Sequence, residues 1–260
     1  MHPLDLSGST ALWMVMLSIG GAIIGSFVAA LTIRWPEGRS VMLGRSSCDH
    51  CGHVLRARDL VPLLSWLVLS GRCRDCGGVI DRRHVTIEVA ATAIGLVAGM
   101  VSPDLAGLAG AVFGWMLLAL ACLDLAALWL PDRLTVLLAV TGPVAGVFGL
   151  APTLEDRLIG GVAGFLVLWS VGWAYRRLRG REGLGGGDPK LLAGIGLWLG
   201  WRLLPGVLLI GSALGLGVAI GLSAKGRAVG RDTPLPFGAF LAAAAYIMWV
   251  ATTWVRLFAA

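Results

Sequence analysis

Residues Leu105–Asp124 read LAGLAGAVFGWMLLALACLD, an apolar run that ends in a single carboxylate. A transmembrane helix needs about 20 mostly apolar residues, so this segment is long enough to cross a bilayer. Its last residue stands out, because an ionisable group at membrane depth is costly to desolvate and points to a function. We therefore expect a membrane helix that carries a functional aspartate, Asp124, near its end.

The composition of the whole chain agrees with a membrane protein. Of its 260 residues 57% are hydrophobic and 14% are charged, and the mean hydropathy is +0.83. These values predict an all-α, polytopic membrane protein with about eight transmembrane helices. The predicted spans are 11–34, 84–102, 105–124, 133–151, 157–175, 189–202, 205–224 and 235–258.

The distribution of positive charge predicts the orientation. With eight spans, 18 of the 21 Lys and Arg residues fall on the same side as residues 35–83, and only Arg157, Arg202 and Arg256 fall on the other. This asymmetry places residues 35–83 in the cytoplasm. The charge balance also favours a break between Arg202 and Pro205. We attribute the net charge of +6 to the excess of Lys and Arg on the cytoplasmic side, where it would contact anionic membrane lipids. We expect no nucleic-acid partner.

The polar segment 35–83 contains two C-x-x-C pairs, Cys48/Cys51 and Cys73/Cys76, with 21 residues between them. Four thiolates at this spacing predict a tetrahedral zinc site. A disulfide or redox role is the alternative, and the reducing cytoplasm argues against stable disulfides. Because a closed four-thiolate site keeps no open coordination position, the zinc would be structural and not catalytic.

Three other features of the chain have simple structural interpretations. The apolar stretch Leu60–Leu69 is too short to span a membrane, so we expect an interfacial helix that begins at Pro62. His50 and His53 could replace a thiolate but are expected at the surface. Cys122, in the third span, is expected to be a small buried hydrophobic residue.

A second carboxylate, Asp188, lies in the segment GLGGGDPKLL at 183–192. An Asp-Pro step commonly caps and starts a helix, so capping alone could explain it. Capping does not explain the preceding glycines, which let the backbone approach closely and leave room for a bound peptide. Asp132, which follows Pro131, is interpreted as a helix cap. Glu88, one turn into the second span, is expected to pair with an arginine or to line the substrate path.

Several separate motifs resemble one family, the type IV prepilin peptidases, over nearly the whole chain. These motifs are Gly25-Ser26-Phe27 with Arg34-Trp35-Pro36, both cysteine pairs with Ser65-Trp66 and Gly71 between them, Asp124 with Leu130-Pro131-Asp132, the GxGD signature Gly185-Gly186-Gly187-Asp188 with Lys190, and Pro236-Phe237-Gly238. The chain departs from the family pattern at Ala29, where asparagine is usual, and at His84-Val85, where Tyr-Pro is usual.

The resemblance implies a bacterial inner-membrane aspartyl protease that cuts basic leaders from prepilins or pseudopilins on the cytoplasmic side. It implies that Asp124 and Asp188 are catalytic, and that S-adenosylmethionine serves a second activity, methylation of the new amino terminus. It divides the chain into a first transmembrane helix (1–34), a zinc loop (35–83) and a peptidase membrane domain (84–260). The residues expected to bind substrate or to support the site are Gly185, Gly187, Lys190, Glu88 and Asp132.

The chemistry of a carboxylate pair fits this activity. Two nearby carboxylates cannot comfortably both ionise, so one keeps a proton while the other can activate water. A basic leader needs acidic partners, for which the candidates are Glu37, Asp49, Asp59, Asp75, Asp81 and Glu182. Two other function classes are considered, a membrane thiol-redox protein and a zinc-loop scaffold of a secretion system.

Overall fold

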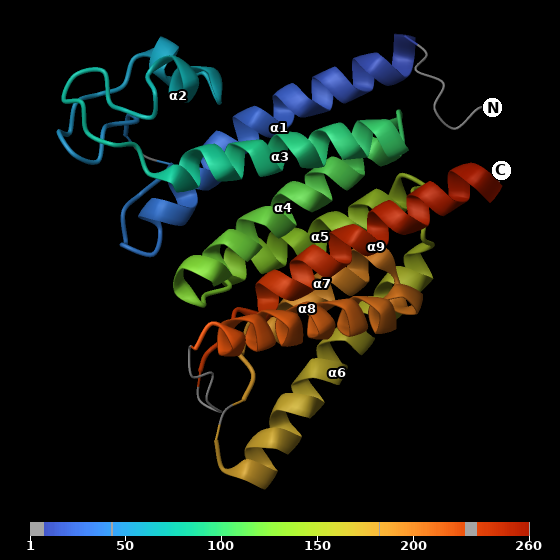
Figure 1. The fold of residues 1–260 in the computed structure, drawn as a ribbon. Helices are drawn as coiled ribbons and strands as arrows, with labels where there is room; N and C mark the ends of the chain where they lie inside the picture. Colours follow the sequence, from blue (N-terminus) through green and yellow to red (C-terminus); the bar gives the residue numbers. More distant parts are fainter. Residues whose placement is uncertain (1–7, 43, 182, 227–232, 260) are drawn as a thin grey trace. The chain divides into compact units, whose positions relative to one another are not determined.

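The computed structural model describes residues 8–42, 44–181, 183–226 and 233–259; Glu182 lies outside them (Figure 1). The described residues are helical apart from loops, and their β contacts are two isolated bridges. Six helices are long and apolar enough to cross a membrane. The chain is therefore a multi-pass membrane protein, and the all-α prediction is confirmed.

The first of two compact units ends at Ala119 and is built on helices α1 (Gly8–Arg34) and α3 (Arg82–Val101). These helices run antiparallel and side by side (Figure 1). Small residues let their backbones touch: a Cβ added to Gly25 would lie 2.8 Å from the Cα of Glu88. Close approach of this kind is how membrane helices gain packing energy where no hydrophobic effect drives them together.

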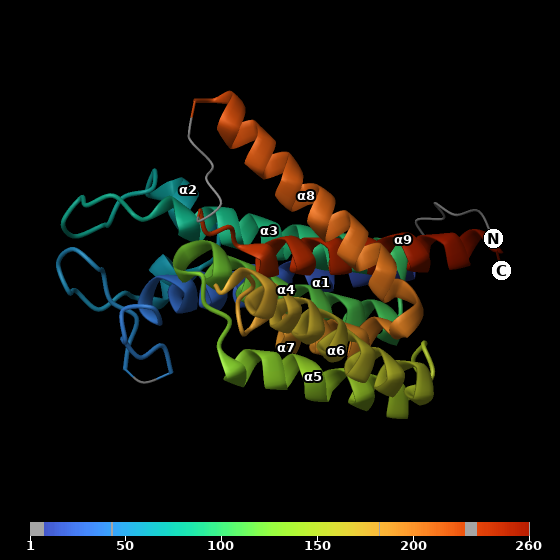
Figure 2. The same cartoon turned by 90° about the horizontal axis from the view of Figure 1, so that it is seen from below.

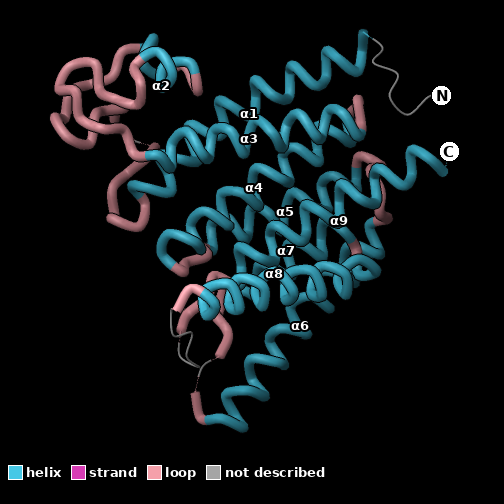
Figure 3. The backbone as a smooth tube through the Cα atoms, viewed as in Figure 1, coloured by secondary structure: helices cyan, strands magenta, loops and turns pink. Residues whose placement is uncertain are grey.

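Between α1 and α3 the chain is mostly loop (Figure 3), with short helices η1 (Ala57–Leu60) and α2 (Leu64–Val68). The helix expected over Leu60–Leu69 is thus present, but it is shorter than predicted and does not begin at Pro62. Leu63 adopts φ +60°, a left-handed conformation that cannot continue a helix, and α2 starts only after it.

The second unit begins at Leu120 and contains the end of helix α4 (Leu105–Ala127). The elements that follow are α5 (Asp132–Val147), α6 (Leu154–Arg179), α7 (Asp188–Leu199), η2 (Trp201–Leu203), α8 (Leu204–Ala224) and α9 (Phe237–Ala259). Helix α7 lies beside α5 and α6 (Figure 2), and nine of its twelve residues are buried. Glycines permit this packing: a Cβ on Gly164 of α6 would lie 2.6 Å from the Leu192 carbonyl oxygen.

The predicted count of eight spans is not confirmed. Helices α5 and α7 have 16 and 12 residues and are absent from the six candidate spans. At 1.5 Å per residue they extend about 24 Å and 18 Å, short of the roughly 30 Å hydrocarbon core. The predicted break near Arg202–Pro205 is present, because Gly200 takes φ +76° and ends α7 before η2 and α8.

Arg157, at the first turn of α6, is almost fully buried, at 1% exposure. Its guanidinium donates to five backbone carbonyls, those of Leu150, Ala151, Pro152, Leu197 and Trp198. The last two belong to the final turn of α7. Arg157 therefore supplies donors that the end of this helix lacks, and it ties that end to the turn before α6.

Candidate functional site

Asp124 lies one turn before the end of α4, and its side chain is buried, at 5% exposure. Its Oδ2 accepts a hydrogen bond of 2.9 Å from the backbone N–H of Ala239, in the first turn of α9. A helix amino terminus suits a carboxylate because its first N–H groups have no partner within the helix. The backbone of Gly238 also approaches Asp124 closely, since a Cβ on this glycine would lie 3.0 Å from the same oxygen. The motif Pro236-Phe237-Gly238 thus places a helix start on Asp124.

Asp188 is the first residue of α7 and is buried to the same degree as Asp124. The capping that could have explained this residue is not seen: Gly187 is the capping residue, and no side chain makes a capping bond there. Instead its Oδ2 accepts a 3.1 Å hydrogen bond from the N–H of Gly185. A Cβ on Gly185 would lie 3.1 Å from that oxygen, so the glycine lets the loop close over the carboxylate.

The structure brings these two aspartates together within the second unit. The carboxylates of Asp124 and Asp188 are close enough to interact electrostatically. The Leu130 side chain packs against the glycines beside the two aspartates, since Cβ atoms on Gly187 and Gly238 would lie 2.7 Å and 2.9 Å from it. Among the described residues no Lys or Arg forms an ion pair with either carboxylate. Both groups are therefore held by backbone N–H donors and not by a cation.

Asp132 and Lys190 form an exposed ion pair of 2.6 Å beside this site. The prediction that Asp132 caps α5 is wrong, because the capping position is Pro131 and the carboxylate turns to Lys190. The pair joins the first turn of α5 to the first turn of α7. Since an exposed ion pair contributes only about 0–1 kcal/mol, its effect is on placement more than on stability.

Glu88 belongs to the first unit, where its side chain is 6% exposed. It accepts a 2.8 Å hydrogen bond from the backbone N–H of Leu63. No arginine pairs with it among the described residues, so the first of its two expected roles is not seen. This hydrogen bond helps to hold Leu63 at its positive φ.

The four cysteines of the loop form one cluster. Their sulfurs all lie within 4.8 Å of one another, and the Sγ atoms of Cys48 and Cys76 are 4.0 Å apart. A tetrahedral zinc with bonds of about 2.3 Å requires sulfurs about 3.8 Å apart, so the arrangement fits a metal ion. Backbone N–H groups of Cys76 and Asp75 lower the pKa of Cys73 to about 7, whereas burial and the neighbouring thiols raise the pKa of Cys76 to about 11, so Cys73 is the more readily ionised thiol of this pair.

Each cysteine pair sits on a tight turn closed by an isolated β bridge, Ser47 with Val54 and Arg72 with Val79. Gly52 and Gly77, which follow the second cysteine of each pair, take φ near +70°. Only glycine adopts this conformation at no cost, so the two turns depend on it. His50 and His53 are exposed, as expected, and Cys122 of α4 is half-buried.

Comparison with known proteins finds matches both for the part of the chain that contains the cysteine cluster and for the part that contains the two aspartates. The model of the bacterial peptidase A24 N-terminal domain matches residues 19–101, and that of the type IV leader peptidase family matches residues 111–220. The chain belongs to the type IV leader peptidase family. This confirms the resemblance found in the sequence. No solved structure matches the chain.

Curated relatives named "Prepilin leader peptidase/N-methyltransferase" are similar over most of the chain. The one from Aeromonas hydrophila is 42% identical over 216 residues, covering 83% of this chain and 73% of the relative. That from Stutzerimonas stutzeri is 36% identical over 284 residues, covering 98% and 95%. That from Dickeya chrysanthemi is 39% identical over 257 residues, covering 88% and 89%.

The matched regions divide the candidate sites. Glu88 and the cysteine cluster lie in the N-terminal match, and Asp124 and Asp188 lie in the leader peptidase match. Leu130 and the N–H of Ala239 were missed as site components by sequence reasoning. Both lie in or beside quoted motifs, but their roles depend on contacts across 50 to 115 residues of chain, which a local pattern cannot reveal.

Proposed function

We propose that this member of the family is a membrane aspartic endopeptidase that removes the leader from type IV prepilins or pseudopilins, with Asp124 and Asp188 as its catalytic pair. The observation that carries the proposal is the pair itself: two buried, interacting carboxylates with which no Lys or Arg of the described residues forms an ion pair. Because like charges at short range oppose joint ionisation, one carboxyl keeps its proton. The ionised partner accepts a proton from water, and the protonated one donates to the peptide carbonyl or the leaving amine.

The neighbouring groups have supporting parts in this proposal. The N–H groups of Gly185 and Ala239 orient the two carboxylates, and Gly187 leaves room for the Leu130 side chain. Lys190, through Asp132, holds the start of α7 to the start of α5. The two carboxylates titrate as one unit, so their acid and base roles are properties of the pair.

The second activity is methylation of the new amino terminus, in line with the name of the relatives. S-adenosylmethionine would supply a methyl group bound to a positively charged sulfur, which an amine can accept. The four cysteines would hold one structural zinc ion that orders residues 35–83, and the peptidase domain would comprise residues 84–260. The gathering of all four sulfurs in one cluster supports this over a thiol-redox pair.

The location that fits this activity is the bacterial inner membrane, with the zinc loop and the aspartate pair on the cytoplasmic side. The distribution of Lys and Arg supports this orientation. It also provides the cationic inner face that attracts anionic membrane lipids.

The test is cleavage of a prepilin by the full chain in lipid nanodiscs, comparing Asp124→Asn and Asp188→Asn with Asp132→Asn. The first two variants should lose about 10²–10⁴-fold in rate, the usual contribution of a general acid or base. Asp132→Asn removes a carboxylate from the same region and should keep most of the activity. Full activity in either Asp124→Asn or Asp188→Asn would refute the proposal. A scaffold or a redox protein predicts that both substitutions leave cleavage unchanged.

A further inference from the structure

Helix α2 and the turn before it carry exposed apolar side chains, although they belong to the polar loop between α1 and α3. Val61, Leu64, Leu67 and Val68 are 42% to 69% exposed, and we call these side chains the α2 patch. Leu64, Leu67 and Val68 follow the i, i+3, i+4 spacing that places side chains on one face of a helix. A contiguous apolar surface of this kind marks a place where a protein contacts another apolar phase.

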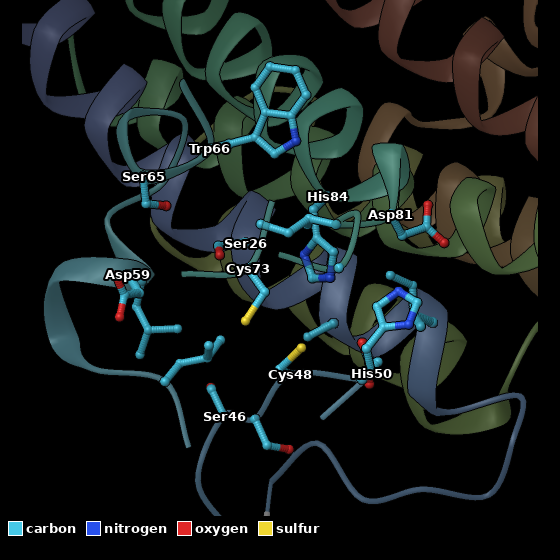
Figure 4. A pocket seen from close by; sticks show the side chains of 18 of the residues that line it. Ser26, Ser46, Cys48, His50, Asp59, Ser65, Trp66, Cys73, Asp81 and His84 are labelled. Atoms are coloured by element: carbon cyan, nitrogen blue, oxygen red, sulfur yellow. The ribbon is translucent and has the colours of Figure 1, made fainter. Parts of the chain in front are cut away.

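The opposite face of α2 is turned inward. Ser65, Trp66 and, just after the helix, Leu69 line a cavity of about 470 Å³ within the first unit. Ser26 of α1 lines the same cavity (Figure 4). The Trp66 ring is closely packed, since a Cβ on Gly71 would lie 3.1 Å from its Cε2 atom. This packing fixes the rotation of α2, so that the α2 patch points away from the cavity.

One hydrogen bond fixes the position of α2 along the membrane helices. The N–H of Leu63, directly before α2, donates to Glu88 at 2.8 Å. Glu88 is six residues after Arg82, where the candidate membrane span of α3 begins, and so lies about 9 Å inside that span. On α1, Ser26 is eight residues, about 12 Å, before the span ends at Arg34. Helix α2 therefore lies beside the ends of both spans (Figure 1), near the depth of roughly 5–10 Å that interfacial helices occupy.

Two cationic side chains border the α2 patch. Arg56 and Arg58 are exposed and precede it directly in the chain. The carboxylate of Asp59, between them and the patch, is bonded to Arg74 at 2.8 Å. Arginines beside an apolar surface match an anionic lipid layer, in which phosphates lie above hydrocarbon chains. The same charge could attract a soluble acidic protein, but at the depth of Glu88 the neighbouring phase is lipid.

We propose that the α2 patch inserts into the bilayer surface on the side of the cysteine loop, with Arg56 and Arg58 at the phosphates of anionic phospholipids. The loop is then attached to the membrane by the end of α1, by the α2 patch and by the start of α3. Lipid on one side and the bond to Glu88 on the other hold α2 in place. The inference goes beyond the proposed function, because it concerns how the loop is held at the membrane and not the reaction.

The test measures the depth of the α2 patch by electron paramagnetic resonance, with the full chain in nanodiscs of phosphatidylcholine and phosphatidylglycerol. The keto amino acid p-acetylphenylalanine replaces Leu67 and carries a nitroxide, which leaves the cysteines unlabelled. Oxygen concentrates in the bilayer and a nickel chelate stays in water, so this label should collide more often with oxygen than with the chelate. The same label at Met42, an 81% exposed residue of the loop outside the α2 patch, should show the reverse.

Two sets of variants separate the apolar from the charged part, with the label at Leu64. Leu67→Asp should raise access of the nickel chelate to that of a label in water, because a carboxylate is costly to insert into a bilayer. The matched control is Leu178→Asp, which changes an 81% exposed leucine at the end of α6 and should leave the label unaffected. Arg56→Gln combined with Arg58→Gln should abolish the difference in insertion between nanodiscs with and without phosphatidylglycerol. Retained metal content verifies the fold of each variant.

The outcomes separate lipid from other partners. A label at Leu67 that meets the nickel chelate as readily as the label at Met42 does overturns the inference. Protection of the Leu67 label only after a prepilin is added also overturns it, because the α2 patch would then be a surface for the substrate. If Leu67→Asp loses its metal, the label at Leu67 still decides, since it keeps an apolar side chain at that position.

The measurement is independent of catalysis. A chain that inserts the α2 patch but does not cleave prepilin refutes the proposed function alone. A chain that cleaves prepilin while the α2 patch remains in water refutes this inference alone.

Discussion

Replacing Gly238 by alanine tests how Asp124 is held. The added Cβ would lie 3.0 Å from the Oδ2 of Asp124 and 2.9 Å from Cδ1 of Leu130, closer than such atoms normally approach. Leu130 can rotate, but the carboxylate can yield only by moving away from the Ala239 N–H that it accepts at 2.9 Å. A displacement of about 1 Å at a catalytic group costs on the order of 10²-fold in rate. We expect Gly238→Ala to lower kcat by that order.

The assay is cleavage of a prepilin over a range of substrate concentrations, together with Tm of the purified chain. The loss should appear in kcat more than in KM, and the overpacking should cost about 1–3 kcal/mol of stability. Gly217→Ala is the matched control, because nothing lies within 4 Å of its added Cβ on α8. It should be neutral or stabilising, as alanine is the better helix former. A Gly238→Ala variant with unimpaired kcat would refute the view that the start of α9 positions Asp124.

Two further predictions concern Arg157 and the cysteine cluster. Arg157→Ala leaves five carbonyls without their donor and should lower the free energy of unfolding by about 3–5 kcal/mol, measured as Tm in detergent. Arg202→Ala, whose side chain is 73% exposed, should cost at most about 1 kcal/mol; equal losses would contradict this. Cys73→Ser, or a chelator, should remove bound zinc and make residues 35–83 more sensitive to trypsin, and an unchanged digestion rate would show that the metal does not order the loop.

Hydropathy predicted where helices lie in this chain, because the bilayer imposes length and composition on each span. It could not decide whether a short apolar segment crosses the membrane or is enclosed by its neighbours. Helix α7 is such a case: nine of its twelve residues are buried, and it packs on α5 and α6 through glycine contacts distant in sequence. Arg157 is another, since its five carbonyl partners come from two separate turns of the chain.

The capping interpretation of Asp132 and the capping alternative considered for Asp188 both failed, because local rules consider only the nearest unpaired N–H groups of a residue's own helix. In the structure Lys190 binds Asp132 from 58 residues away, and the N–H of Gly185 in the preceding loop binds Asp188. The motif analysis singled out Asp124 and Asp188, which the structure brings together, because a carboxylate at membrane depth is itself the signal.

The manner in which the aspartate pair is held bears on its chemistry. A guanidinium beside either carboxylate would keep it ionised and would remove the proton donor that peptide cleavage requires. Backbone N–H groups orient an oxygen without adding a full positive charge, and the bonds from Gly185 and Ala239 each reach the Oδ2 atom of their carboxylate. Neither of these two bonds occupies Oδ1. Two carboxylates anchored in this way can share one proton while keeping their geometry, which is the arrangement that acid–base cleavage of a peptide bond needs.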